Sequence, residues 1–85
     1  MSYTVSFNAH AGRAFRKLPK NIQERLKPAI DGLEDNPHPF GSEKLSGPED
    51  TYRIRVGDYR ILYELHDKIL VVLVVEVGHR REVYR

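Results

Sequence analysis

The stretch YRIRVGDYRILY, residues 52–63, decides the fold of this 85-residue chain. Apolar and polar side chains alternate on both sides of Gly57-Asp58, which is typical of two strands joined by a two-residue turn that begins with glycine. Such a turn fixes which residues of the two strands face each other. The expected pairs are Val56 with Tyr59, Arg55 with Arg60, Ile54 with Ile61, and Arg53 with Leu62.

The two faces of this predicted hairpin differ in chemistry, because paired residues share a face and faces alternate along each strand. The apolar face carries Tyr52, Ile54, Val56, Tyr59, Ile61 and Tyr63. The polar face carries Arg53, Arg55, Arg60, Leu62 and Glu64. A shift of register by one residue would bury the arginines and expose the isoleucines, so this register is well determined.

The segments around the hairpin predict an α+β fold with the order β-α-α-β-β-β. Asn8 is a suitable N-cap for the first helix, and Pro19 ends that helix. The expected elements are a strand at 3–7, helices from Asn8 to about Leu18 and over about 20–34, a polar loop to about 50, and strands at about 51–56, 59–65 and 69–77. We expect one domain over residues 1–85, an antiparallel sheet with a two-helix hairpin packed on one face and an open basic face.

Composition excludes several classes of site. The chain has no cysteine, so disulfides and thiolate metal sites are excluded, and its four histidines share no metal-ligand spacing. We therefore expect neither a metal nor another cofactor. His10, His38 and His66 are interpreted as surface residues without a role. The start, MSYTVSFNAH, has no signal-peptide pattern, and the apolar run ILVVLVV at 69–75 is too short to span a bilayer, which favours a cytoplasmic protein that does not enter membranes.

Arginines are concentrated on the open face of the predicted sheet. Arg55 directly opposite Arg60 would destabilise a hairpin by roughly 0.2–1 kcal/mol, since like charges repel. Long side chains that separate in solvent, with Glu64 and Glu76 as counter-charges, are one interpretation. A phosphate-binding surface is the other, and it is favoured because Arg80 and Arg81 directly follow the strand expected beside 59–65.

Three segments together resemble one known family. KLSG at 44–47, YRIRVGDYRILYEL at 52–65 and VGHRREVY at 77–84 are similar to the RelE side of the RelE/ParE superfamily of toxin–antitoxin toxins. The resemblance implies an endoribonuclease that cleaves mRNA in the ribosomal A site without a metal and so inhibits translation. In such cleavage the RNA 2′-OH attacks the adjacent phosphate and leaves a 2′,3′-cyclic phosphate. It also implies a RelB-like cognate antitoxin, through which the toxin–antitoxin complex would bind operator DNA.

The resemblance also implies a set of site residues. The implied catalytic residues are Arg53, Arg55, Arg60, Arg80, Tyr84 and His79, and the implied RNA-binding residues are Arg53, Arg55, Arg60 and Arg81. The best-known RelE has lysines at the positions of Arg53 and Arg55. Arginine stays protonated and cannot act as a base, so these two are interpreted, with Arg60, as phosphate clamps.

The general base is left open at this point between His79, Glu43 and another group. Glu43 resembles a catalytic glutamate of the YoeB branch, but its interpretation as an ordinary loop acid is favoured. His79 is otherwise a spacer before the tail. Tyr84 would donate a proton, stack on a base, or anchor the C-terminus. Two alternative functions fit the same fold: a ParE-like gyrase poison, and a non-catalytic nucleic-acid-binding module.

Overall fold

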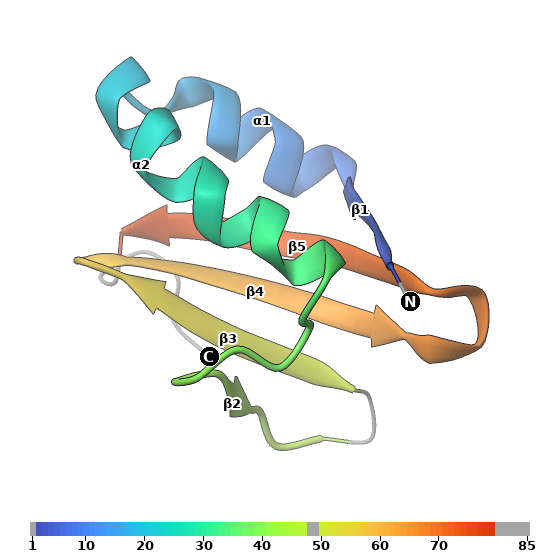
Figure 1. Cartoon of the computed structure of the whole chain (residues 1–85). Helices are drawn as coiled ribbons and strands as arrows, with labels where there is room; N and C mark the ends of the chain where they lie inside the picture. Colours follow the sequence, from blue (N-terminus) through green and yellow to red (C-terminus); the bar gives the residue numbers. More distant parts are fainter. Residues whose placement is uncertain (1, 48–49, 80–85) are drawn as a thin grey trace.

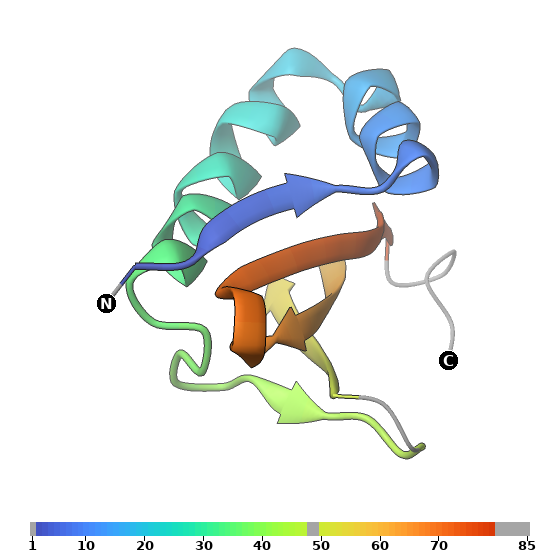
Figure 2. The ribbon, with the colours of Figure 1, turned by 90° about the vertical axis from the view of Figure 1, so that its right-hand side faces the viewer.

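The computed structural model describes residues 2–47 and 50–79, in which two helices lie on one side of a five-stranded sheet (Figure 1). The elements are β1 (Thr4–Phe7), α1 (Ala9–Lys17), α2 (Lys20–Asp31), the 3-10 turn η1 (Gly32–Glu34), β2 (Glu43–Lys44), β3 (Thr51–Val56), β4 (Tyr59–His66), the 3-10 turn η2 (Asp67–Ile69) and β5 (Val71–His79). The opposite side of the sheet carries no helix within these residues (Figures 1 and 2). This confirms the predicted α+β fold.

The predicted hairpin is observed with the predicted register. Arg55 faces Arg60 and Ile54 faces Ile61, as do the other expected pairs. Gly57 has φ +60°, in the left-handed region that favours glycine, as the glycine-first turn requires. The turn therefore sets both faces of β3 and β4.

The sheet order is β1-β5-β4-β3-β2, and two features differ from the expected antiparallel sheet. β1 pairs with β5 in parallel, because the chain crosses over the sheet through the helices before it returns beside β1 (Figure 2). The segment expected to be only a polar loop contains β2, which pairs with the start of β3. The sheet is therefore mixed, with three antiparallel ladders and one parallel ladder.

The core lies between the helices and the apolar face of the hairpin. Its buried members are Ala11, Leu26, Ile30, Leu33, Ile54, Ile61, Tyr63, Leu65, Val72, Val74 and Val77. Full burial of one aliphatic side chain contributes about 1.5–3 kcal/mol, so this layer supplies most of the stability. The Asn8 side chain caps α1 by accepting a hydrogen bond from the Ala11 N–H at 2.7 Å, which confirms the predicted helix start.

A β-bulge interrupts the β4–β5 ladder. Leu62 faces Glu76, but the next residue, Tyr63, faces Val74, so Val75 is an extra residue in β5. The alternation of faces along β5 changes at this point: Val74 and Val77 are both in the core, whereas Glu76 lies on the open face with Leu62. The bulge thereby brings a carboxylate to the face that carries the arginines.

Candidate nucleic-acid interface

Three predicted arginines share the open face. Arg55 and Arg60 are directly opposed across β3 and β4, and Arg53 faces Leu62 one position further along this face. In β5 the residue opposite Arg60 is Gly78, which adds no side chain between the guanidinium groups and solvent. The predicted convergence is therefore observed for Arg53, Arg55 and Arg60. Arg80, Arg81 and Tyr84 lie outside the described residues.

Glu43 explains how the opposed arginines are tolerated. β2 places Glu43 opposite Arg53, whose Nη2 donates a hydrogen bond to Glu43 Oε1, and the same oxygen lies 3.9 Å from Arg55 Nη2. The hydrogen bond from Arg53 lowers the pKa of Glu43, and the charges of Arg53, Arg55 and Arg60 lower it further. Glu43 is thus an ionised counter-charge at neutral pH and a weak proton acceptor.

The guanidinium groups of this cluster differ in how far a ligand can reach them. The Nε atoms of Arg53 and Arg60 are shielded from solvent and have no acceptor among residues 2–47 and 50–79. An unsatisfied donor costs about 1–3 kcal/mol. The exposed fraction is 17% for the Arg53 side chain and 58% for that of Arg55, so the cluster is partly shielded and still reachable. Oxygen-rich anions such as phosphate match these donors in charge and geometry.

His79 lies on the covered face, away from Arg53, Arg55 and Arg60. It faces Tyr59 in the β4–β5 ladder, and the two rings meet edge to face with centroids 5.5 Å apart. Tyr59 belongs to the face that the helices cover. Since Gly78 takes the position opposite Arg60, alternation along β5 turns His79 to the other face.

A groove beside the arginines makes the open face less uniformly basic than predicted. It has a volume of about 560 Å³, and its walls are Asn8, His10, Leu45, Ser46, Thr51, Leu62, Glu64, Val75 and Glu76. Leu62 is buried although it lies on the open face, because these neighbours cover it. The open face therefore has an arginine cluster (Arg53, Arg55 and Arg60) and, next to it, this groove with two carboxylates.

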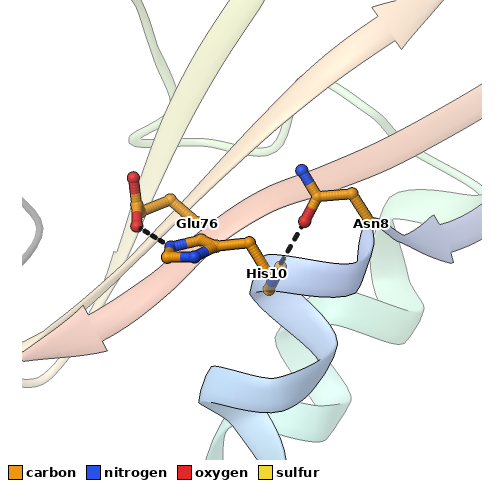
Figure 3. A network of polar contacts seen from close by, with 4 residues as sticks. Asn8, His10 and Glu76 are labelled. Atoms are coloured by element: carbon orange, nitrogen blue, oxygen red, sulfur yellow. Dashed lines mark hydrogen bonds and ion pairs between the residues drawn. The ribbon is translucent and has the colours of Figure 1, made fainter.

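Two histidine–carboxylate pairs lie at the groove. His10 Nε2 in the first turn of α1 is 2.5 Å from Glu76 Oε1 (Figure 3). His66 Nε2 is 3.1 Å from Glu64 Oε1. The His10 side chain is 61% exposed and that of Glu76 only 16%, so the carboxylate is held in the wall and the imidazole is accessible. Sequence reasoning missed the first pair, because only the bulge and the position of α1 bring its members together.

The part of the chain that the structure describes contains no group of three side chains suited to hold a metal ion and no helix long and apolar enough to cross a membrane.

The sequence and the fold are similar to those of known toxins. Residues 1–84 match the family described as "ParE toxin of type II toxin-antitoxin system, parDE". A "Putative RelE-like toxin protein" of Escherichia coli is 38% identical over 82 residues, which cover 94% of this chain and 85% of the relative. The "mRNA interferase toxin RelE" of Escherichia coli K12 is 34% identical over 88 residues, covering 99% of this chain and 92% of the relative. The crystal structure of an archaeal RelE-RelB complex from Pyrococcus horikoshii OT3 contains a chain with a TM-score of 0.82 and 34% identity, covering 94% of this chain and 97% of that chain.

Proposed function

Since the chain belongs to the RelE/ParE family of toxins from type II toxin–antitoxin systems, we propose that it is an mRNA interferase that cleaves mRNA in the ribosomal A site. The observation that carries this proposal is the cluster of Arg53, Arg55 and Arg60 on a sheet face without a helical cover. A relative named as an mRNA interferase toxin is 34% identical over almost the whole chain. The arginine cluster is where such a protein needs positive charge, because its substrate is a polyanion.

The arginine cluster would act by binding phosphate and stabilising charge. In the proposed reaction the ribose 2′-oxygen forms a bond to phosphorus, the bond from phosphorus to the 5′-oxygen breaks, and a 2′,3′-cyclic phosphate and a 5′-OH result. The 2′-OH loses its proton to a base, and the leaving 5′-oxygen gains one. Negative charge accumulates on the phosphorane oxygens, and guanidinium groups held close to them stabilise it without changing their own protonation.

Glu43 would keep the cluster assembled in the free protein. Its carboxylate contacts Arg53 and lies near Arg55, so the two guanidinium groups are held together without RNA. A phosphate that binds Arg53 and Arg55 has to replace this carboxylate, so Glu43 also competes with RNA for the two guanidinium groups. This role is electrostatic and differs from that of a general base.

Three residues near the C-terminus, Arg80, Arg81 and Tyr84, are added to the proposed site because they match positions of the family. Arg80 would add charge stabilisation at the phosphorane, Arg81 would contact RNA, and Tyr84 would donate a proton or stack on a base. Each of these three roles can be tested in an mRNA cleavage assay, in which Arg80 and Arg81 are replaced by alanine and Tyr84 by phenylalanine.

The proposed partner is a RelB-like antitoxin that covers the arginine cluster with acidic and apolar side chains. The solved relative from Pyrococcus horikoshii is a RelE-RelB complex, and the small core of this chain leaves it dependent on such cover. Binding to the native state alone raises the melting temperature by mass action. The complex would bind operator DNA through the antitoxin, and a cytoplasmic location follows from a ribosomal target.

A ParE-like gyrase poison is the alternative that the matching family description itself favours. The two functions separate in one experiment in which the purified protein is added to translating ribosomes and, in parallel, to gyrase with supercoiled DNA. We expect new mRNA 5′ ends within A-site codons and unchanged DNA. Gyrase-dependent DNA breaks with intact mRNA would establish the alternative and overturn the proposal.

A further inference from the structure

We propose that His10 and Glu76 form the catalytic dyad that removes the proton from the RNA 2′-OH, with His10 as the base and Glu76 as its positioning residue. This inference rests on the proposed function, because it assigns a residue to the same cleavage reaction. The reaction needs a proton acceptor on the open face, and the arginines cannot act as one.

The other candidate acceptors are less suitable. Glu43 is engaged by Arg53, and the hydrogen bond from Arg53 lowers its pKa. The His79 ring contacts Tyr59 on the covered face. Tyr63 is buried in the core, and its hydroxyl donates to the Pro37 carbonyl oxygen at 2.8 Å. Two described histidine–carboxylate pairs, His10–Glu76 and His66–Glu64, combine an accessible imidazole with the open face. Of the two carboxylates, Glu76 lies nearer to Arg60 in the register of the sheet.

The register places this dyad within reach of a phosphate on Arg60. Arg60 faces Gly78, and Leu62 faces Glu76, so Glu76 is the diagonal neighbour of Arg60 across one ladder. Diagonal neighbours on one face are about 7–8 Å apart, and long side chains span that distance. A phosphate held by Arg60 therefore leaves its own ribose near the dyad. The groove of about 560 Å³, whose walls include His10 and Glu76, has room for the nucleoside that carries the reacting 2′-OH.

The contact between the two side chains assigns their roles. When His10 Nε2–H donates to Glu76 Oε1 at 2.5 Å, the lone pair that accepts a proton is on Nδ1 (Figure 3). The carboxylate fixes this tautomer and stabilises the imidazolium formed when Nδ1 takes the 2′-proton. At the same time the 2′-oxygen bonds to phosphorus, and the leaving 5′-oxygen takes a proton from water.

Several charged groups surround the dyad. Glu64 lies in the same groove, and its carboxylate contacts the imidazole of His66. Arg60 is the diagonal neighbour of Glu76, and Arg53 lies beyond Leu62 in the same row of the sheet. A change in pH dependence is assigned to His10 only when its own substitution removes that dependence.

The test is single-turnover cleavage of ribosome-bound mRNA as a function of pH, with His10→Gln, Glu76→Gln and the control His66→Gln. We expect His10→Gln to lower the cleavage rate about 10²–10⁴-fold and to remove the decline in rate at acidic pH, while ribosome binding stays unchanged. Glu76→Gln should lower the rate less and shift that decline. His66→Gln makes the same chemical change in the other pair and should leave the rate unchanged.

Further measurements distinguish a failure of the dyad proposal from a folding defect and from a failure of the proposed function. Free imidazole should restore cleavage by His10→Ala, which a structural role of His10 would not allow. Wild-type rate and pH profile in His10→Gln would overturn the dyad and leave the toxin function standing. A reduced rate without any change in pH profile and without rescue by imidazole would also overturn it. If the wild-type protein cuts no mRNA on ribosomes, the proposed function fails and the dyad fails with it.

Discussion

The two faces of the β3–β4 hairpin are built from the same twelve-residue stretch and serve opposite purposes. Ile54, Ile61 and Tyr63 are buried under the helices, whereas Arg53, Arg55 and Arg60 lie on the face without helices. One turn at Gly57 places every residue of both sets. The comparison teaches that stability and function are separated by a single-residue alternation, so neighbouring substitutions should have unrelated effects.

Substitution on the covered face should have the largest effect. Ile61 is fully buried, so Ile61→Asp places a charge without a partner in the core. We expect a loss of more than about 4 kcal/mol and an unfolded chain, as measured by circular dichroism and urea titration. The control is Arg60→Asp at the preceding position, which should fold. Two folded variants would contradict the assignment of faces.

Substitution on the open face should affect activity and leave stability intact. Arg60→Ala removes one guanidinium from the proposed phosphate site and should lower the rate of mRNA cleavage about 10²–10³-fold. Its melting temperature should stay close to that of the wild type, since Arg60 has no acceptor in the described part of the chain for its Nε. Lys27→Ala, on the helical side, loses the same charge and should keep full activity. If Arg60→Ala and Lys27→Ala lost the same activity, the loss would be due to the change in net charge and not to the position of Arg60.

Tyr63 gives a smaller effect on the covered face. Its hydroxyl donates to Pro37, and burial raises its pKa to about 12. Because the raised pKa belongs to the folded state, the associated stability is complete below the ordinary tyrosine pKa of about 10 and is lost as pH rises from about 10 through 12. We expect Tyr63→Phe to cost about 0.5–1.5 kcal/mol at pH 7 and to reduce the alkaline decline in urea titrations. If the stability of Tyr63→Phe declined at alkaline pH as much as that of the wild type, groups other than Tyr63 would be responsible for the decline.

Glu43 gives the smallest effect, on the open face. Its lowered pKa in the folded state means that its stabilisation is present above the ordinary glutamate pKa and is lost as pH falls through the folded value. Glu43→Gln should remove this part of the acid sensitivity and tighten RNA binding slightly, because no carboxylate then competes for Arg53 and Arg55. Glu24→Gln in α2 is the control. Weaker RNA binding in Glu43→Gln would show that the carboxylate contacts RNA favourably.

The hairpin was predictable because its geometry is local. A two-residue turn and strict alternation leave one register that buries apolar residues, so every pair from Arg53 to Leu62 could be written from the sequence. The Asn8 cap was predictable for the same reason, since the Asn8 side chain accepts its hydrogen bond from the N–H of Ala11, only three residues further along the chain. The parallel β1–β5 pairing was missed, because it joins segments at opposite ends of the chain.

The groove was not predictable, because its geometry depends on an irregularity. The run of valines in β5 does not reveal which residue is extra, and Val75 is identified only by its partners in β4. Without the bulge Glu76 would lie on the covered face. The same uncertainty explains why His10 was given no role, although α1 brings it to Glu76.

The side-chain Nε–H signals of the arginines, followed by NMR during titration with a short RNA in which 2′-O-methyl groups block cleavage, test the central claim most directly. We predict that the signals of Arg53, Arg55 and Arg60 shift and that those of Arg13 and Arg16 on α1 do not. Shifts confined to the helical arginines, with the three sheet arginines unchanged, would contradict the assignment of RNA binding to the open face.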